Sequence, residues 1–546
     1  MKSSHARVTL NQSIKKIQPL VVANDAGHFM LHDGRQGSVR CSPKLLLECC
    51  TPEVIDPASL ELIQVLELHK AIDHTHSATG SAVLLRSLLQ PSTDLHYIRS
   101  KQASVGEILS DDRLRQFLAD LIGQFSLAEG ALYNFFNKGL VALSPYLDLK
   151  RARQAAVDLA RLSATLPVVE SSFLSLLLQQ LQTYAGSSLS RMMAGPIYKT
   201  FKGLKSDREA GLLTPKLKFV PRRITKWLLA GPAMFAAPYI HSHLGLGAPL
   251  SPMLSTLGAA WTGIGLFYGL FVKPVKDTGN FVEPLRVQSI HDPVFSRAID
   301  AVGRLDELLS FCEFAGKSSQ ATTRPRIMDD DHHAFEARGL NNPILAGGGV
   351  ACVPNTIRMQ DTRLTFITGP NSGGKTTLCK SIVHNQLLAQ IGSHVLAEKA
   401  AINIADMIRY QAPKFDGLQD EEGRFGTELG RTRDIFYATG PRSLVILDEL
   451  AEGTTHEERM QTARGILSDF NTIGNNTILV THNHSLVDRF MAERKGQCLK
   501  VEFRDDDPTY KVLPGISRVS HADRIAEKIN FSRADRRRYL HEKGYL

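Results

Sequence analysis

Cysteines are few in this 546-residue sequence, and none of the seven belongs to a CxxC pair. Their odd number and irregular spacing argue against a zinc ribbon or a thioredoxin-type site, and they favour a reducing, cytosolic setting. The first ten residues lack the apolar core of a secretory signal peptide. A hydrophobic content of 43% and a charged content of 22% argue against a chain that is disordered throughout and against a many-pass membrane transporter.

Acidic residues are outnumbered by basic ones. The sequence contains 64 Lys and Arg against 55 Asp and Glu, which gives a net charge of +9. This excess, spread over a long chain, favours acidic partners such as nucleic acid or anionic lipid. The length predicts two to four domains.

Helical spacing of apolar residues dominates the first half of the chain. After a mixed lead-in over 1–52, stripes of leucine and isoleucine predict packed helices over 53–198 and again over 278–320. Residues 321–334 are predicted to be a linker, because they combine a proline with runs of basic and acidic residues. His332 and His333 follow three aspartates, but consecutive side chains point in different directions, so a solvated loop is favoured over a metal site.

An insert of unusual composition interrupts the helical region at 199–277. Its first part, 199–226, carries nine Lys or Arg and two acidic residues, and 227–272 contains no Asp, Glu, Lys or Arg. The segment Met253–Val272 has 20 residues, about the length that a helix needs to cross a bilayer. The first half of the run is expected to be broken by Pro232 and Pro238.

Two interpretations of this insert remain open. Two apolar segments with basic residues at both outer ends predict a membrane hairpin whose two ends lie in the cytosol. Alternatively, the segments form a helical hairpin that is buried against protein or that presents a partner-binding tip. The membrane interpretation is favoured slightly.

A phosphate-binding motif follows an apolar strand predicted over 364–367. The sequence Gly-Pro-Asn-Ser-Gly-Gly-Lys-Thr-Thr and then a helix complete the P-loop pattern in its strand–loop–helix context. Its glycines allow backbone N–H groups to converge on phosphate oxygens at a helix N-terminus. Lys375 is expected to reach the β- and γ-phosphates, and the Thr376 hydroxyl to bind Mg²⁺. The predicted nucleotide-binding residues are Gly369, Pro370, Asn371, Ser372, Gly373, Gly374, Lys375, Thr376 and Thr377.

Two more apolar strands end in residues that suit phosphate chemistry. The strand 443–447 precedes Asp448 and Glu449, and the strand 477–480 precedes Thr481 and His482. Asp448 is suited to hold Mg²⁺, and Glu449 is suited to polarise the attacking water. His482 lies at a strand end beside the nucleotide and can sense the γ-phosphate. We therefore predict Glu449 and His482 as catalytic residues.

Together these motifs resemble the ATPase domain of the MutS family, one of the ABC-type ATPases. The resemblance covers about 335–540, and residues 75–110 resemble the helical core domain of the same family. The matching segments are 339–343, 353–355, 368–377, 391–397, 447–455, 481–482, 509–510, 515–517 and 524–527.

Four departures from the family pattern are visible. The signature Ser-x-Phe-x-x-Glu is 423–428 here, and Gly423 replaces the serine that would contact the partner's γ-phosphate. Cys352 stands where an aromatic residue that stacks on adenine is expected, and Glu452 replaces the usual arginine before Gly453. No N-terminal Phe-x-Glu mismatch-reading motif is visible. These changes bear on the turnover and on the trans-activation that the resemblance implies. They bear less on ATP binding.

The resemblance implies an α/β P-loop ATPase domain with a mostly parallel sheet at 335–508, a helical dimerisation segment at 509–546, and an all-α core and lever domain. It implies ATP and Mg²⁺ as cofactors and a dimer that ATP binding closes, because each signature completes the partner's site. It also implies binding to double-stranded DNA, as in mismatch repair, through 199–226 and the arginines of 533–538. The competing reading is a membrane-tethered ATPase that moves the hairpin or a partner. The predicted location is cytoplasmic, with membrane association through 227–272.

Overall fold

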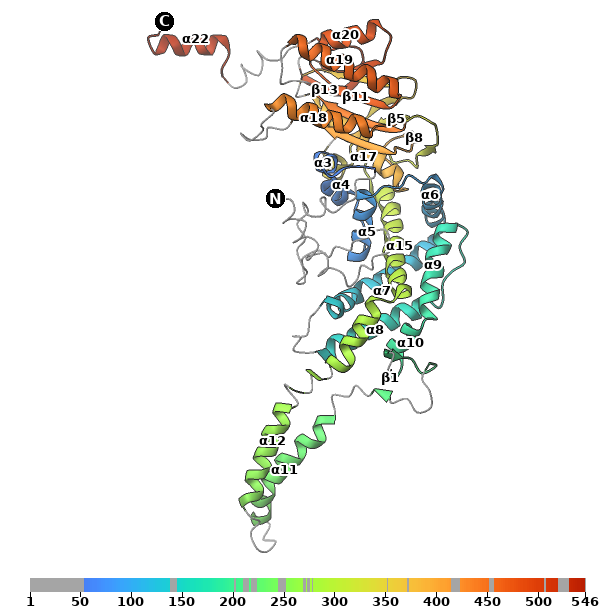
Figure 1. Cartoon of the computed structure of the whole chain (residues 1–546), viewed down its shortest axis with the longest axis vertical. Helices are drawn as coiled ribbons and strands as arrows, with labels where there is room; N and C mark the ends of the chain where they lie inside the picture. Colours follow the sequence, from blue (N-terminus) through green and yellow to red (C-terminus); the bar gives the residue numbers. More distant parts are fainter. Residues whose placement is uncertain are drawn as a thin grey trace. The chain divides into compact units, whose positions relative to one another are not determined.

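The computed structural model divides the chain into two compact units (Figure 1). Of the described residues, the helical unit contains Thr75–Val83 and Asp112–Glu307, and the α/β unit contains residues 54–74, Leu84–Asp111 and those from Leu308 onwards. The lead-in predicted over 1–52 lies outside the described residues. The structure describes 54–137, 145–200, 203–209, 216–217, 223–243, 252–268, 272, 275–276, 278–350, 352–370, 373–413, 423–450, 456–504, 507–518 and 530–545.

The helical unit has the packed helices that the leucine stripes predict. In α7 the buried residues Leu118, Leu121, Ile122 and Phe125 follow helical spacing, so one face of this helix forms core. A short antiparallel sheet, ordered β2-β1-β3, follows these helices. The elements are α5 (Ala78–Leu89), α7 (Asp112–Asn137), α8 (Pro145–Leu162), α9 (Ser172–Ala185), α10 (Ser188–Ala194), β1 (Ile197–Thr200), β2 (Gly203–Lys205), β3 (Lys216–Leu217), η3 (Thr278–Val282), α14 (Glu283–Ile290) and α15 (Pro293–Lys317), of which α5 and α15 continue into the α/β unit.

A buried carboxylate fixes the start of α5 within the helical unit. Asp306 of α15 is fully buried and accepts hydrogen bonds from the Ser77 backbone N–H at 2.8 Å and the Ser77 hydroxyl at 2.6 Å. A negative charge is favourable at a helix N-terminus because the first N–H groups have no partner inside the helix. Gly80 lies against this carboxylate so closely that a Cβ atom would overlap it.

The insert forms a helical hairpin. Helices α11 (Arg223–His243) and α12 (Pro252–Phe267) pack side by side. Pro232 and Pro238 lie inside α11, so the predicted break there is wrong, because a proline can kink a helix without ending it. Of the predicted apolar segment 253–272, residues 253–267 lie in α12, and 269–271 lie outside the described residues. Among the described residues, no helix combines the length and the apolar character needed to cross a membrane, so the predicted transmembrane hairpin is not supported.

The α/β unit is built on a six-stranded sheet with the order β13-β12-β7-β11-β10-β9. Every pairing is parallel except that of β12 with the edge strand β13. The strands β7, β10 and β11 are buried along almost their whole length, which is typical of parallel strands covered on both faces. Their bounds are β7 (Leu364–Thr368), β9 (Met407–Gln411), β10 (Ser443–Asp448), β11 (Asn476–Val480), β12 (Gln497–Arg504) and β13 (Asp507–Pro514).

A four-stranded sheet with the order β4-β8-β5-β6 belongs to the same unit. Strand β4 lies inside the segment predicted to be a linker and pairs with β8, and His333 in that segment is fully buried. The linker prediction is therefore wrong there. Strand β13 likewise lies at the start of the segment predicted to be helical. The bounds are β4 (Arg326–Met328), β5 (Phe335–Leu340), β6 (Asn355–Met359) and β8 (Lys399–Asn403).

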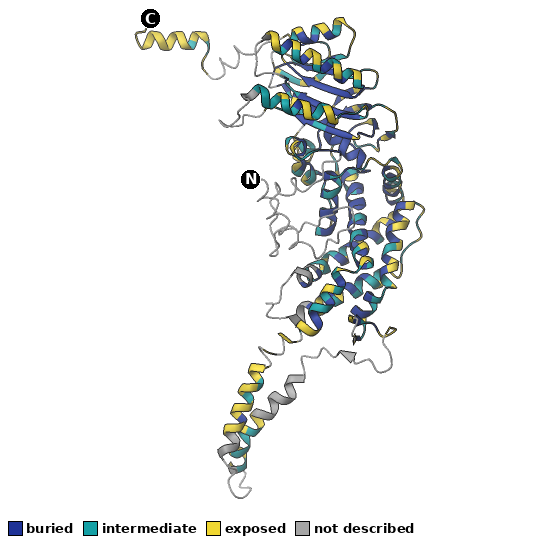
Figure 2. Ribbon diagram, in the orientation of Figure 1, coloured by how far each residue is buried: buried dark blue, intermediate teal, exposed yellow. Residues whose placement is uncertain are grey.

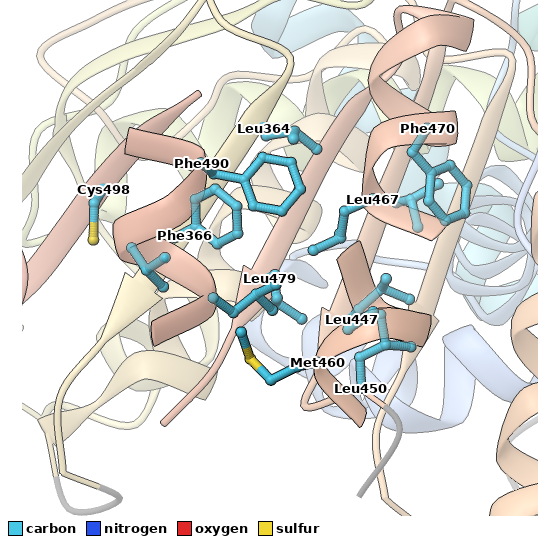
Figure 3. Packing of buried hydrophobic residues seen from close by; sticks show 14 of the residues in the cluster. Leu364, Phe366, Leu447, Leu450, Met460, Leu467, Phe470, Leu479, Phe490 and Cys498 are labelled. Atoms are coloured by element: carbon cyan, nitrogen blue, oxygen red, sulfur yellow. The ribbon is translucent and has the colours of Figure 1, made fainter. Parts of the chain in front are cut away.

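Helices cover the six-stranded sheet and enclose its core. Alternate residues of β7 and β10, such as Phe366 and Leu447, pack against Leu467, Phe470 and Phe490 (Figure 3), as the two-residue period of a strand requires. The helices of this unit are α3 (Pro57–Leu62), α4 (Val65–Ile72), α6 (Leu95–Ser110), α16 (Pro343–Gly347), α17 (Lys375–Gln390), α18 (Gly423–Ala438), α19 (His456–Ile473), α20 (His484–Ala492) and α22 (Arg533–Glu542).

Candidate nucleotide-binding site

Three neighbouring strands bring the predicted site residues to one edge of the sheet. Strands β7, β11 and β10 are adjacent and parallel, so their carboxyl ends lie at the same edge. The P-loop follows β7, His482 follows β11, and Asp448 and Glu449 lie at the end of β10. In parallel α/β sheets, ligands bind outside this edge.

The backbone of the loop after β7 needs glycine at two positions. Gly369 has φ +138° and Gly374, the N-cap of α17, has φ +80°, which residues with a Cβ rarely adopt. The Gly373 N–H donates to the Pro370 carbonyl at 3.1 Å, which closes the turn. Asn371 and Ser372 lie outside the described residues. In the described part of the loop, glycine therefore occupies both positions at which the backbone needs it.

Lys375 is folded back onto the loop. Its Nζ donates to the carbonyls of Gly369 at 2.6 Å and Pro370 at 2.8 Å, and the side chain is buried. Burial lowers the pKa of this lysine, and the nearby carboxylates of Asp448 and Glu449 oppose that effect. The ammonium is therefore held at the loop, where phosphate oxygens could replace the two carbonyls.

Two oxygen groups from different elements meet beside the loop. The hydroxyl of Thr376 donates to the Asp448 carboxylate at 3.2 Å, and Thr376 is exposed. A hydroxyl and a carboxylate are hard oxygen ligands of the kind that Mg²⁺ prefers. Both residues fit the predicted metal-binding role. The neighbouring Thr377 lies half-buried, and its carbonyl accepts a hydrogen bond from Ser381 inside α17.

Glu449 and His482 lie next to each other at the strand ends. His482 Nε2 is 3.7 Å from Glu449 Oε1. Glu449 has φ +64°, a left-handed conformation that is uncommon for a residue with a side chain and that often marks functional positions. Its N–H donates to the Val480 carbonyl at 2.9 Å, which ties β10 to β11. A cavity lined by both side chains, Arg459 and His484 adjoins them.

The helix that follows the loop is buried almost throughout. Of the 16 residues of α17, 13 are buried, six of them polar residues after the first turn: Ser381, His384, Asn385, Gln386, Gln390 and, with its thiol, Cys379. Apart from Cys379, these side chains bind neighbouring backbone: His384 Nε2 lies 2.7 Å from the Ile63 carbonyl, and Gln386 donates to the Asn403 carbonyl at 2.8 Å. Burial lowers the pKa of His384 to about 4, so it stays neutral. Sequence reasoning did not detect this network, because its residues carry no motif.

Tyr510 is a residue beside the glycine loop that the sequence did not single out. It belongs to β13, has φ +59° and is 51% exposed. Its ring lies beside Gly374, where a Cβ atom would meet it at 3.1 Å. Asn355 holds the strand by donating to the Tyr510 carbonyl at 3.0 Å and accepting from the Val512 N–H at 2.8 Å. The left-handed backbone of a tyrosine is a signal that only coordinates reveal.

The residues that depart from the family pattern lie in different parts of the chain. Gly423 begins α18, and Phe425 of the same helix packs against the core cluster. Cys352, where an aromatic residue was expected, is half-buried. Glu452 and Gly453 lie outside the described residues. Within the described part of the chain, no group of three or more His, Cys, Asp or Glu side chains could hold a metal ion by itself, so His332 and His333 form no such site.

A mostly parallel sheet, a glycine loop before a buried helix, and an Asp-Glu pair at the end of β10 are the features of a P-loop domain of the ATPase class. A family model described as MutS domain V matches residues 365–534, and many curated MutS proteins are similar in sequence. Residues 365–534 therefore match the domain V of MutS proteins, and the similarity to MutS proteins covers only part of their length.

The relatives are larger proteins. A "DNA mismatch repair protein MutS" of Myxococcus xanthus is 31% identical over 257 residues, which are 45% of this chain and 28% of that protein. One of Haloquadratum walsbyi is 36% identical over 188 residues, 34% of this chain and 20% of that protein. One of Symbiobacterium thermophilum is 27% identical over 489 residues, 79% of this chain and 54% of that protein. The chain thus spans only a fifth to about half of these relatives.

Proposed function

We propose that this chain binds ATP with Mg²⁺ at the P-loop and hydrolyses it. The observation that supports this most directly is the approach of Thr376 to Asp448 at the edge where Lys375, Glu449 and His482 also lie. The family supports an ATPase in general. The roles of the individual residues are inferred from the geometry of this site.

Each residue has a distinct role in the proposed reaction. The N–H groups of the loop and of the first turn of α17 bind phosphate oxygens, and Lys375 exchanges its loop carbonyls for the β- and γ-phosphates. Thr376 and Asp448 hold Mg²⁺, which neutralises charge that develops on the phosphates. Glu449 orients and polarises the attacking water, and His482, next to it, contacts the γ-phosphate. The Tyr510 ring, beside Gly374, offers a surface on which adenine can stack.

The partners that we propose are double-stranded DNA and a second copy of the chain. Relatives are named DNA mismatch repair proteins, and a net charge of +9 favours a polyanion. Helix α22 exposes four arginines, Arg533, Arg536, Arg537 and Arg538. In this proposal ATP closes the dimer and hydrolysis reopens it, so that the γ-phosphate selects between two states.

Nucleotide binding is the first experiment. Fluorescent ATP titrated into the purified chain should bind in the presence of Mg²⁺, and Lys375→Ala should weaken binding or abolish turnover, because it removes the ammonium that faces the phosphates. Lys495→Ala, a change of the same kind at an exposed ion pair with Glu493, is the matched control. A chain that ignores ATP, or a Lys375→Ala variant with normal binding and turnover, would refute the proposal.

DNA binding is tested separately. The affinity for a duplex should fall steeply with salt, because cations that contact phosphates release counterions on binding. Replacing the three arginines 536–538 with glutamine should reduce both the affinity and the salt slope, and deletion of 199–276 tests the other basic segment. Binding that is independent of salt would contradict the DNA proposal while leaving the ATP proposal intact.

A further inference from the structure

The α11–α12 hairpin places small residues inside and large apolar residues outside, which is the reverse of a helical hairpin that is stable in water. In α12 the residues turned inwards are small: Gly258 is buried, and Thr262 and Gly265 are half-buried. The large apolar residues of the same helix point outwards, with exposed fractions of 67% for Ile264 and 62% for Phe267. Small residues at a helix–helix seam with large apolar residues outside are the arrangement of helices in lipid.

Helix α11 repeats this arrangement. Phe235, Tyr239 and Ile240 are exposed, whereas Ala236 and Ala237 are half-buried. Figure 2 shows most of α12 in the colour of exposed residues. Where their burial is described, the largest apolar side chains of α12 and the aromatic residues of α11 thus face the outer surface.

The exposed apolar surface also extends around the helix. At 100° per residue, the exposed residues of α12 from Leu257 to Phe267 occupy roughly two-thirds of its circumference. A partner protein or a second copy of the hairpin covers one stripe of a helix, about as wide as an ordinary amphipathic face. A surrounding apolar medium covers the whole arc. A helix that is apolar on nearly all sides is therefore better matched by lipid than by a single docked protein.

The charged residues on either side of the apolar run indicate which kind of lipid surface would bind the hairpin. Residues 227–272 contain no Asp, Glu, Lys or Arg, while Arg222, Arg223 and Lys226 precede the run and Lys273 and Lys276 follow it. Because α11 and α12 form a hairpin, Arg223 and Lys226 near the start of α11 and Lys276 after the end of α12 belong to the same end of it. Cations at that end are complementary to anionic headgroups. A DNA backbone, by contrast, would find no cation along the apolar helices.

We propose that the hairpin inserts into the surface of a bilayer that contains anionic lipid and enters it without crossing it. Among the residues that the structure describes, no helix is both long and apolar enough to cross the hydrocarbon core. The basic residues remain at the headgroups. This property is separate from ATP binding.

Tryptophan fluorescence offers a direct test, because both tryptophans of the sequence, Trp227 and Trp261, belong to the hairpin. The full chain carrying Trp227→Phe leaves Trp261 as the only reporter. It is mixed with phosphatidylcholine vesicles with and without phosphatidylglycerol, and with lipids brominated at shallow or deep acyl positions. We expect flotation with the anionic vesicles, a blue shift, and quenching by the brominated lipids.

Matched substitutions separate insertion from adhesion. Ile264→Glu should lower the vesicle-bound fraction at least about tenfold, because a carboxylate must be placed in or near hydrocarbon. Leu127→Glu makes a similar change at an exposed leucine of α7, 90% exposed, and should leave binding unchanged. The proposal is overturned if the chain does not float and Trp261 is not quenched, or if both variants lose binding equally. It is also overturned if Ile264→Glu instead abolishes self-association without lipid, which would identify a second copy as the occupant.

Discussion

Thr376 and Asp448 are 72 residues apart in the chain, and the hydroxyl of the first donates to the carboxylate of the second at 3.2 Å. This contact joins the start of α17 to the end of β10, although β11 lies between β7 and β10 in the sheet. It is the point at which two separate sequence motifs become one site.

The Thr376 hydroxyl can be tested by size-matched changes. Thr376→Ala should reduce Mg²⁺-dependent ATP hydrolysis by at least about tenfold and raise the Mg²⁺ concentration required, because one oxygen ligand is lost. Thr376→Ser keeps the hydroxyl and should retain most of the activity. Steady-state hydrolysis measured over a Mg²⁺ titration distinguishes the two variants. Equal activities of the alanine and serine variants would contradict the assignment.

Glu449 should be needed for hydrolysis but not for binding. Glu449→Gln keeps the shape of the side chain and removes the base, so hydrolysis should fall by about 10²–10⁴-fold, while ATP remains bound. Single-turnover hydrolysis and retention of labelled ATP on a filter measure the two effects. If the variant hydrolysed ATP at the normal rate, another residue would have to act as the base.

Tyr510 should contribute to affinity through its ring. Tyr510→Ala should weaken ATP binding by about tenfold, the value of one stacking contact, while Tyr510→Phe should bind normally. Tyr510→Gly removes the ring but relieves the left-handed backbone at φ +59°. A loss of affinity in the glycine variant without a loss of thermal stability would therefore identify the ring, rather than the fold of β13, as the cause.

His384 predicts a pH dependence of stability. Burial lowers its pKa from 6.5 to about 4, so the unfolded chain binds a proton between these values and the folded chain does not. The contribution of neutral His384 to the free energy of unfolding is complete above the pKa of this group in the unfolded chain. It is lost as the pH falls from about 6.5 towards 4. Because of His384, a fall in pH from 7 to 5 should lower the free energy of unfolding by about 2 kcal/mol.

His384→Gln removes the titrating group and can still donate to the Ile63 carbonyl. Urea unfolding of the wild-type chain and this variant at both pH values should therefore give a shallower pH dependence for the variant. His333, whose pKa burial also lowers to about 4, remains in both proteins and serves as the background. Identical pH dependences would show that His384 is not held neutral.

Gly80 and Gly123 form a matched pair within the helical unit. Gly80→Ala should destabilise the chain by about 2–4 kcal/mol, because its methyl group overlaps the buried Asp306 carboxylate. Gly123 in α7 has no neighbour near an added Cβ atom, so Gly123→Ala should stabilise the helix by up to about 1 kcal/mol. Thermal unfolding measures both, and a harmless Gly80→Ala would mean that α5 is not held against Asp306.

Much of the site could be predicted because its residues are close in sequence to strand ends. The spacing from Gly369 to Lys375 and the Asp-Glu pair at 448–449 fix the chemistry locally, and buried parallel strands bring such ends together. Tyr510 could not be predicted, because its position depends on β13 pairing back onto β12 and on a left-handed backbone. Strand β4 was missed since three residues of strand carry too weak a pattern to separate from a loop.

The prolines of α11 show another reason why part of the fold could not be predicted from the sequence. A proline lowers the probability of a helix, but Pro232 and Pro238 lie within one because the surrounding helix persists on both sides. The inward placement of Gly258 and the outward placement of Ile264 likewise depend on how α12 faces α11. Composition detects that this segment is apolar, and only the packing shows which side is exposed.

Helix α17 has almost no water-facing side, and its polar residues bind backbone from strand β8 and from the segment before α4. A change of volume at most positions along it would therefore disturb several layers at once, with no surface onto which the misfit could be displaced. For protein engineering, this makes α17 a poorly adaptable part of the α/β unit.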